Sequence, residues 1–349
     1  MKTDDFDYYL PLDLVAQTPI TDRSSSRLLI LDKNTGDIKE DRFFNILEYL
    51  DKNSVLVINN TKVVPARIIG EKEDTKAKIE LLILKDLGSN IYECLAKPQR
   101  RLKIGTKVIF KDGLLVAIVK EIFDEGIIRV EFIYQGIFYE VLDRIGEVPL
   151  PPYIHKKLDN IDRYQTVYSK IKGSSAAPTA GLHFTNEILT KIRDAGIEIV
   201  EVTLSIGLGT FRPVQVEDVE KHKMHTESYT ISPISAAILN RAKRENKKIV
   251  AVGTTSLRTL EANYQKYNEF REETSETSIF IYPGYKFKAI DELITNFHLP
   301  KSTLIMLVSA LASKENIMNA YKYAVDNKFR FFSFGDSMYI TNKIRKIEE

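Results

Sequence analysis

The pattern that limits the possible folds of this chain most strongly lies between about residues 68 and 150, where short apolar runs are separated by Gly-bearing turns. Such runs are typical of a β-meander or a small barrel. Few helix signals interrupt them before about residue 137. We therefore predict an inserted β domain over 68–150, whose strands are expected at 78–85, 90–97, 106–111, 114–123 and 127–134.

Outside this insert, strands alternate with helices, which predicts a mixed α/β main domain formed by residues 1–67 and 151–349. Short apolar strands are expected at 55–58 and 249–252, and a half-buried strand at 199–206, where apolar and polar residues alternate. Thr185 is expected to cap a helix that Gly196 ends, and Ser302 to cap a helix over 304–311. Another helix is predicted after the turn at 253–256, through Leu257 and Leu260.

Composition is that of an ordinary globular protein, with 44% apolar and 28% charged residues among 349. No apolar run approaches the roughly 20 residues needed to span a bilayer. The acidic N-terminus lacks the apolar stretch of a signal peptide, and the sole cysteine, Cys94, cannot form an internal disulfide. We therefore expect a cytoplasmic protein without membrane contact. A net charge of +2 means that any nucleic-acid binding must depend on local basic patches.

Small and polar residues gather where strands end, and the first such segment is 173–185. Its small side chains let a ligand approach the backbone closely, and its end enters a helix, whose free N–H groups favour anions. Thr179, Gly181 and His183 are the candidates here. A tight packing loop with a capping histidine is the structural alternative.

The second segment, 205–213, carries a glycine pair, Gly207 and Gly209, followed by Thr210 and Arg212. The pair is similar to a nucleotide-binding turn, but a proline follows instead of a helix, so the dinucleotide fingerprint is not met. Arg212 could hold a carboxylate or a phosphate, or form a surface ion pair.

The third segment, 222–227, places His222 and His225 three residues apart. The chain has only five histidines and one cysteine, so a zinc site lacks partners and no metal is expected. Glu227 near His225 suggests an acid/base pair, with a hydrogen-bonded loop as the alternative.

Two further segments combine strand ends with polar side chains. Segment 252–261 presents Thr254 and Thr255 to a ligand, while Arg258 and Glu261 could simply pair on the helix. Segments 280–285 and 295–303 offer an aromatic ring for stacking on a base, an amide for recognition and a histidine as proton carrier. The alternative is a corner of the hydrophobic core, where Tyr and Phe are common. The candidates in these two segments are Tyr282, Asn296 and His298, and a later aromatic cluster ends in the carboxylate of Asp336.

One basic group stands out in the insert and could neutralise phosphates, although a solvated surface turn is the commoner explanation for such a group. It consists of Lys97, Arg100, Arg101 and Lys103.

These segments, in this order, resemble the S-adenosylmethionine:tRNA ribosyltransferase-isomerase family. The resemblance runs from end to end of the chain and is far more specific than any single short motif. It also includes residues 5–11, 23–29, 59–67, 146–154 and 162–168.

The resemblance implies a barrel-like α/β main domain with an inserted small β-barrel. It implies that the ribosyl part of S-adenosylmethionine moves to 7-aminomethyl-7-deazaguanine at the wobble position of a tRNA with a GUN anticodon. The product would be epoxyqueuosine in tRNA, with release of adenine and methionine. S-adenosylmethionine would be a consumed substrate, no metal or redox cofactor would take part, and the enzyme would act as a monomer.

This chemistry needs proton transfers, because a sulfonium acidifies the neighbouring C–H, departing adenine takes a proton and the attacking amine loses one. His183 or His298 is our candidate base, with Glu227 and Asp336 as further candidates. The expected substrate-binding residues are Thr179, Gly181, Gly207, Gly209, Thr210, Arg212, His225, Thr254, Thr255, Arg258, Tyr282 and Asn296, and the expected RNA-binding residues are Lys97, Arg100, Arg101 and Lys103.

The chain departs from the family pattern at a few positions. Ser205 stands where a histidine is usual, so either that histidine is not essential or Ser205 and a water replace it. Lys62 replaces a usual arginine and keeps the charge without the bidentate geometry. Ser175 and Thr226 are mild changes.

Two other functions compete with this interpretation. A methyltransferase would share the donor but needs a Gly-rich turn between a first strand and its helix, and Pro213 argues against one at 207–209. A non-catalytic RNA-binding module should carry a basic stripe with exposed aromatics, which a net charge of +2 does not favour.

Overall fold

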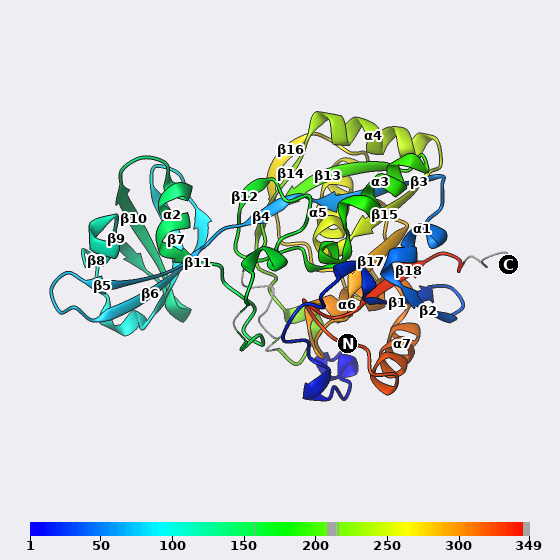
Figure 1. Ribbon diagram of the computed structural model, residues 1–349, viewed down its shortest axis with the longest axis horizontal. Coiled ribbons are helices and arrows are strands. Elements are labelled where there is room, and N and C mark those ends of the chain that lie inside the picture. Colours follow the sequence, from blue (N-terminus) through cyan, green and yellow to red (C-terminus); the bar gives the residue numbers. More distant parts are fainter. Residues whose placement is uncertain (157, 208–213, 215, 345–349) are drawn as a thin grey trace. The chain divides into compact units, whose positions relative to one another are not determined.

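The computed structural model describes residues 1–156, 158–207, 214 and 216–344. Contacts divide the chain into two compact units, whose elements Figure 1 labels. The main unit comprises Met1–Thr61, Pro152–Ile171 and Ala177–Glu349, and the barrel unit comprises Lys62–Pro151 and Lys172–Ala176.

Six strands of the barrel unit form a closed antiparallel barrel among the described residues. Their order is β5-β6-β7-β10-β9-β8, and pairing of β5 with β8 closes the ring. In β7, Tyr92, Cys94 and Ala96 are buried while their neighbours are more exposed, as expected for a barrel wall. The strands are β5 (Arg67–Lys72), β6 (Lys78–Asp86), β7 (Ile91–Lys97), β8 (Lys107–Phe110), β9 (Leu115–Ile122) and β10 (Ile127–Tyr134); α2 (Phe138–Ile145) and β11 (Gly146–Glu147) follow.

The main unit is built on one mixed sheet with the order β16-β14-β13-β3-β15-β17-β18-β1-β2 among the described strands. Its four central strands, β13, β3, β15 and β17, run parallel. The strands are β1 (Arg27–Asp32), β2 (Ile38–Arg42), β3 (Ser54–Asn59), β13 (Glu198–Leu204), β14 (Glu227–Ile231), β15 (Lys248–Val252), β16 (Glu273–Thr277), β17 (Glu292–Asn296) and β18 (Ser337–Thr341); a separate short pair is formed by β4 (Thr61–Val63) and β12 (Ile171–Ser174).

Helices follow the parallel strands and pack on them. The longest, α5 (Gly253–Tyr267), contacts β13, β3, β15 and β17. The hydroxyls of Thr185 and Ser302 cap their helices by accepting from the N–H groups of Ile188 and Ile305. The other helices of the main unit are α1 (Ile46–Tyr49), α3 (Asn186–Asp194), α4 (Pro233–Arg244), α6 (Thr303–Ala312) and α7 (Lys314–Asp326).

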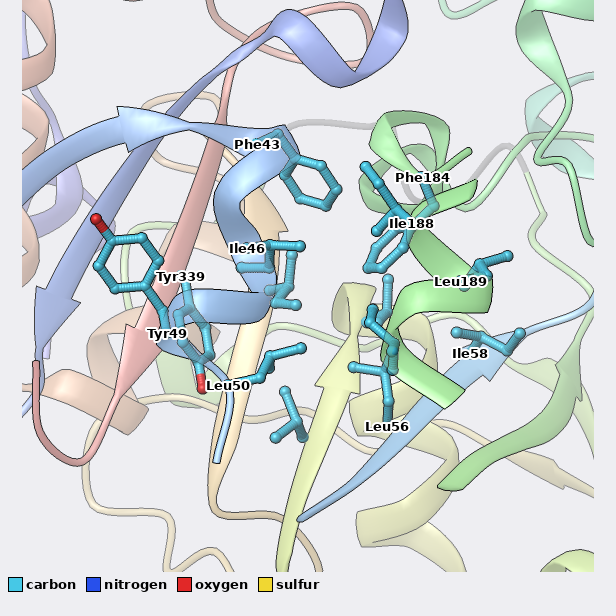
Figure 2. Close-up of a cluster of buried hydrophobic side chains, with 14 of the residues drawn as sticks. Phe43, Ile46, Tyr49, Leu50, Leu56, Ile58, Phe184, Ile188, Leu189 and Tyr339 are labelled. Atoms are coloured by element: carbon cyan, nitrogen blue, oxygen red, sulfur yellow. The ribbon is translucent and has the colours of Figure 1, made fainter. Parts of the chain in front are cut away.

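A buried apolar cluster fixes the segment before α3 against the sheet. In Figure 2, Phe43 lies opposite Phe184, and Ile188 projects from α3 into the same cluster. The rings of Phe43 and Phe184 meet edge to face at 4.9 Å between centroids. Because Phe184 directly follows the 3-10 helix η9 (Thr179–His183), this packing holds His183 in place.

The predicted fold class, mixed α/β with an inserted small β-barrel, is confirmed. The alternation predicted for 199–206 is also present, since Val200, Val202 and Leu204 are buried and Glu201 and Thr203 are less so. No helix in the described part of the chain is long and apolar enough to cross a membrane.

Candidate active site

A cavity, called the main cavity below, lies in the main unit at the carboxyl ends of parallel strands, where α/β sheets usually bind their ligands. Its volume, including the opening, is about 710 Å³. The residues that follow β15 and β17 form much of its wall, and Ile206 contributes from just beyond β13. The lining residues are Tyr153, Ala177, Pro178, Thr179, Ala180, Ile206, Gly253, Thr254, Thr255, Thr295, Asn296, Phe297, His298, Leu299, Ser302, Leu304, Phe332 and Ser333.

The first turn of α5 forms one side of this cavity. Gly253 has φ +83°, a left-handed conformation that lets β15 turn sharply into the helix. Val252 at the N-cap provides no side-chain hydrogen bond, so the first N–H groups of α5 are not capped by it. The buried Oγ1 of Thr255 has no hydrogen-bond partner among the described residues. This turn therefore offers donors to an electron-rich ligand group.

Asn296, at the end of β17, presents an unused acceptor. Its Nδ2 donates to the carbonyl of Phe332 at 3.0 Å and contacts Nε2 of His183 at 3.2 Å. Its Oδ1 is buried and has no partner within the described part of the chain. An unsatisfied buried acceptor costs about 1–3 kcal/mol, which a ligand N–H would recover. Asn296 is therefore suited to recognise an amine or a base edge.

His183 is held on both ring nitrogens. Because Nδ2 of Asn296 donates to Nε2, we assign the ring proton to Nδ1, which then donates to Oγ of Ser26 at 2.8 Å. Burial, together with the positive charges of Arg23 and Arg330, lowers the pKa of His183 to about 3. The imidazole is therefore neutral at pH 7, and it orients Asn296 instead of lining the main cavity.

His298 lines the main cavity directly. Its Nε2 lies 3.0 Å from Oγ1 of Thr295, and burial lowers its pKa to about 3. Two tyrosines hold its backbone, since its N–H donates to Oη of Tyr321 at 2.9 Å and its carbonyl accepts from Oη of Tyr8 at 2.5 Å. A neutral, firmly placed imidazole therefore faces the cavity.

Gly181 does not line the cavity, but η9 requires it. A Cβ at this position would lie 1.9 Å from Oη of Tyr168. Thr179, two residues earlier, does line the cavity. The glycine of this segment therefore permits close packing beneath the ligand-facing residues.

A second group of predicted residues gathers at the start of β14 and on α5, outside the cavity lining. Arg258 and Glu227 form a buried ion pair, and Nε2 of His225 lies 3.4 Å from Oε1 of Glu227. Nε and Nη2 of Arg258 are buried without a partner among the described residues. Of the glycine segment, Gly207 is described and does not line the cavity, whereas Gly209, Thr210 and Arg212 lie outside the described residues.

Asp336 and Tyr282 also lie outside the cavity lining. Asp336 accepts from the backbone N–H groups of Arg27 and Arg330, both at 2.8 Å, and burial raises its pKa. Tyr282 packs against Phe280 with 5.0 Å between ring centroids. Asp336 thus holds the chain near β1.

The four predicted RNA-binding cations lie on the barrel unit, at the end of β7 and around the 3-10 turn Gln99–Arg101. All four are exposed, and none forms an ion pair with a described residue. We call Lys97, Arg100, Arg101 and Lys103 the basic turn.

Several cavity residues were absent from the predicted site. Thr295 and Ser302 fall in a segment that the sequence did single out, and Ser333 falls in the aromatic cluster before Asp336. Tyr153 donates to or accepts from Oγ of Ser333 at 2.5 Å, a contact that no sequence spacing reveals. Among the described residues, no group of His, Cys, Asp or Glu is arranged to hold a metal ion.

Comparison with known proteins matches nearly the whole chain to one family. Residues 3–340 match the model of the family described as "Queuosine biosynthesis protein". A protein of Clostridioides difficile (strain 630) named S-adenosylmethionine:tRNA ribosyltransferase-isomerase is 56% identical over 340 residues, covering 97% of this chain and 100% of the relative. A protein of the same name from Thermoanaerobacter sp. (strain X514) has the same identity and coverage.

A solved structure gives the same result. The crystal structure of S-adenosylmethionine tRNA ribosyltransferase from Thermotoga maritima superposes with a TM-score of 0.55 at 34% identity, covering 96% of this chain and 99% of the other. The match to the family model over nearly the entire chain and the 56% identity of full-length relatives show that the chain belongs to the queuosine biosynthesis protein family.

Proposed function

We propose that this chain transfers the ribosyl moiety of S-adenosylmethionine to 7-aminomethyl-7-deazaguanine at the tRNA wobble position and isomerises it, giving epoxyqueuosine-tRNA, adenine and methionine. Relatives that are 56% identical and covered completely carry the name of this activity. The observation that supports it best in the structure is a strand-end cavity with two unused buried polar atoms, Asn296 Oδ1 and Thr255 Oγ1. S-adenosylmethionine is consumed as a substrate, and the proposed reaction uses no metal.

Asn296 is the residue proposed to bind an amine group of a substrate. Its Oδ1 is a hydrogen-bond acceptor fixed by the two contacts of Nδ2. Both the exocyclic amine of adenine and the aminomethyl group of the acceptor base carry N–H donors that fit it. Thr179, Thr254 and Thr255 line the same cavity and are the proposed hydroxyl contacts.

His298 is the proposed proton carrier, because it is the candidate histidine that lines the cavity. Its lowered pKa keeps it neutral beside a cationic sulfonium, which avoids repulsion between like charges. In this proposal it takes the C–H proton and passes it to the departing adenine. His183 is then a positioning residue that acts through Asn296.

The remaining predicted residues take supporting roles in this proposal. The carboxylate of Glu227 is paired with Arg258 and that of Asp336 with two backbone N–H groups, so neither is the base we favour. Arg258 keeps unused N–H donors and, with Gly207 and His225, remains a proposed substrate contact. Ser205, which stands where the family usually has a histidine, is half-buried. It directly precedes Ile206, a residue that lines the main cavity, so this position lies next to the cavity in the sequence.

The basic turn of the barrel unit is the proposed contact for tRNA phosphates, because its four cations are exposed and unpaired among the described residues. A tRNA substrate fits the expected cytoplasmic location. We expect a monomer.

The test is to incubate the protein with an anticodon stem-loop RNA that bears 7-aminomethyl-7-deazaguanine and with labelled S-adenosylmethionine. Mass analysis should find epoxyqueuosine in the RNA, and adenine and methionine should appear in equal amounts. Formation of S-adenosylhomocysteine would indicate a methyltransferase instead, and RNA binding without any turnover would indicate a non-catalytic module.

Substitution of the proposed proton carrier refines this test. His298→Gln should lower adenine release at least about 100-fold, the usual contribution of a general acid–base group. His155→Gln is the matched control, because His155 is exposed and does not line the cavity. Equal turnover in both variants would exclude His298.

A further inference from the structure

A second, smaller cavity of about 300 Å³ shares one lining residue with the main one. Ser333 lines both cavities. His183 lines the smaller one and contacts Asn296, which lines the larger. Arg23, Ser26 and Arg163 also line the smaller cavity.

Arg23 and Arg163 line this smaller cavity, and Arg330 lies close enough to act on its lining residue His183. Among the described residues, the side chains of all three arginines donate only to backbone carbonyls. Arg163 donates through Nη1 to the carbonyl of Thr21 at 2.9 Å and through Nη2 to that of Ile20 at 2.6 Å. Arg23 donates to the carbonyl of Gln165 at 3.1 Å. Arg330 donates to the carbonyl of Thr18. These contacts fix the guanidinium groups without neutralising them.

No carboxylate among the described residues forms an ion pair with any of the three arginines. Asp336, the acidic group that acts on Arg330, is occupied by two backbone N–H groups. Burial and the positive charge of Arg163 lower the pKa of Arg23. The positive charges of Arg23 and Arg330 in turn help burial to lower the pKa of His183. Three arginines against the one carboxylate of Asp336 leave this cluster with a net positive charge.

Donors also remain unused in this cluster. Nε of Arg163 and Nη1 of Arg330 are buried and have no hydrogen-bond partner in the described part of the chain. A guanidinium carries five N–H groups in a rigid fork that matches the oxygens of a carboxylate or phosphate. Half-buried guanidinium groups with unused donors beside a cavity are suited to an oxyanion, because their hydrogen bonds to it are charge-assisted.

We propose that Arg23, Arg163 and Arg330 form an anion subsite that binds one oxyanion group of a substrate whose reacting part occupies the main cavity. This rests on the proposed function, which supplies two such groups: a phosphodiester of the RNA and the carboxylate of the donor. Binding there would anchor the substrate on the far side of His183 and Asn296. The same guanidinium chemistry serves either group, so the experiment must separate them.

The test replaces Arg163 and Arg23 in the full chain. Arg163→Gln and Arg23→Gln remove charge while keeping a donor for the backbone carbonyl, and Arg163→Lys keeps the charge without the fork. Arg244→Gln, on the exposed last turn of α4, is the control with the same loss of charge. For each variant, KM for the stem-loop RNA, KM for S-adenosylmethionine, kcat and the melting temperature are measured.

Each Gln variant should raise one KM about tenfold or more with a small change in kcat, and Arg163→Lys should recover part of the loss. If an RNA phosphate is bound, KM for RNA rises and the slope of log affinity against log salt falls by about 0.7–0.9 per contact. If the donor carboxylate is bound, KM for S-adenosylmethionine rises and the salt slope of RNA binding stays unchanged.

Unchanged KM values for both substrates in folded Gln variants would overturn the proposal, and so would a fall in kcat alone. The arginines would then have a structural role only, in which they hold residues 18–21 in place. If Arg163→Gln does not fold, Arg23→Gln and Arg163→Lys decide. If the wild-type protein shows no turnover, the proposed function fails. The subsite is then tested by measuring the affinities of wild type and variants for stem-loop RNA and for S-adenosylmethionine directly. Equal affinities in wild type and variants would exclude the subsite.

Discussion

Asn296 and His183 share a hydrogen bond of 3.2 Å that fixes the orientation of the Asn296 amide. The second N–H of Asn296 is used by Phe332, so the amide cannot rotate without losing both contacts. The imidazole thus fixes an acceptor, Oδ1, at the wall of the main cavity. This relationship gives the first prediction.

Asn296→Leu should lower kcat/KM about 10- to 100-fold, because a ligand N–H would lose its buried acceptor at a cost of about 1–3 kcal/mol. Steady-state kinetics with the modified stem-loop measures this change. His183→Gln should produce a smaller loss of the same kind, since it frees the amide without removing it. Asn53→Leu, on an exposed turn, is the control, and an equal effect there would contradict the assignment.

The two buried histidines should make the fold sensitive to acid. Their pKa values are about 3 when folded, against an ordinary value of 6.5, so the unfolded chain binds more protons between these limits. Stability therefore rises with pH in this window and is lost as pH falls below about 6.5. Each histidine should contribute a slope of up to about 1.4 kcal/mol per pH unit.

Chemical denaturation at pH 7, 6 and 5 measures this slope. The double variant His183→Gln/His298→Gln should show a flatter pH dependence than wild type, whatever its stability at pH 7. His155→Gln, at an exposed site, should leave the slope unchanged. A double variant as steep as wild type would show that the histidines are not held neutral.

Gly181→Ala should destabilise the main unit by about 1–3 kcal/mol or more, because the new Cβ would collide with the Tyr168 hydroxyl. That hydroxyl is buried without a partner among the described residues, so Tyr168→Phe alone should be close to neutral. The double variant should recover part of the lost stability, because Cγ2 of Thr166 and Cζ of residue 168 would still lie 2.8 and 2.9 Å from the new Cβ. Thermal melts of the wild type, the two single variants and the double variant complete a double-mutant cycle. If the two changes in stability were strictly additive, the collision with the Tyr168 hydroxyl would be disproved.

Arg258→Met should cost about 3–5 kcal/mol of unfolding free energy, since it leaves Glu227 buried beside His225 without its arginine. Adding Glu227→Gln should restore part of that loss by removing the charge. Lys322→Met, which breaks an exposed pair with Asp326, should change stability by less than about 1 kcal/mol. Equal losses in both single variants would argue against a buried pair.

The basic turn should contribute to RNA affinity in a salt-dependent way. Arg100→Gln/Arg101→Gln should weaken stem-loop binding and lower the slope of log affinity against log salt by up to about 1.4–1.8, or 0.7–0.9 per lost phosphate contact. Lys120→Gln/Arg129→Gln removes the same charge from barrel cations that are already ion-paired, and should change the slope less. Fluorescence anisotropy at several salt concentrations separates the two.

Local signals in the sequence predicted the elements that carry the site. Thr185 and Ser302 cap the helices they were expected to cap, and the apolar runs of the insert became barrel strands. These features depend on neighbours within a few residues, so spacing alone reveals them.

The composition of the cavity depends on contacts between distant residues and could not be read in this way. Ser26 reaches His183 across 157 positions, and Tyr153 reaches Ser333 across 180. From the sequence, His183 and His298 are equivalent candidates for the catalytic base, whereas the hydrogen bonds of the fold give them different surroundings. The arginines around the smaller cavity carry no local signal, because each binds backbone carbonyls of a remote segment.

The chain passes between its two units four times, and the last passage is between Ala176 and Ala177. Ala176 belongs to the barrel unit, where the preceding Ser175 donates to the carbonyl of Ile83, and Ala177 already lines the main cavity. A barrel transplanted from a relative as residues 62–151 alone would thus leave five of its residues behind, directly upstream of Thr179. Chimaeras of this enzyme family should exchange both segments together, because one peptide bond joins the last residue of the barrel unit to Ala177, which lines the main cavity.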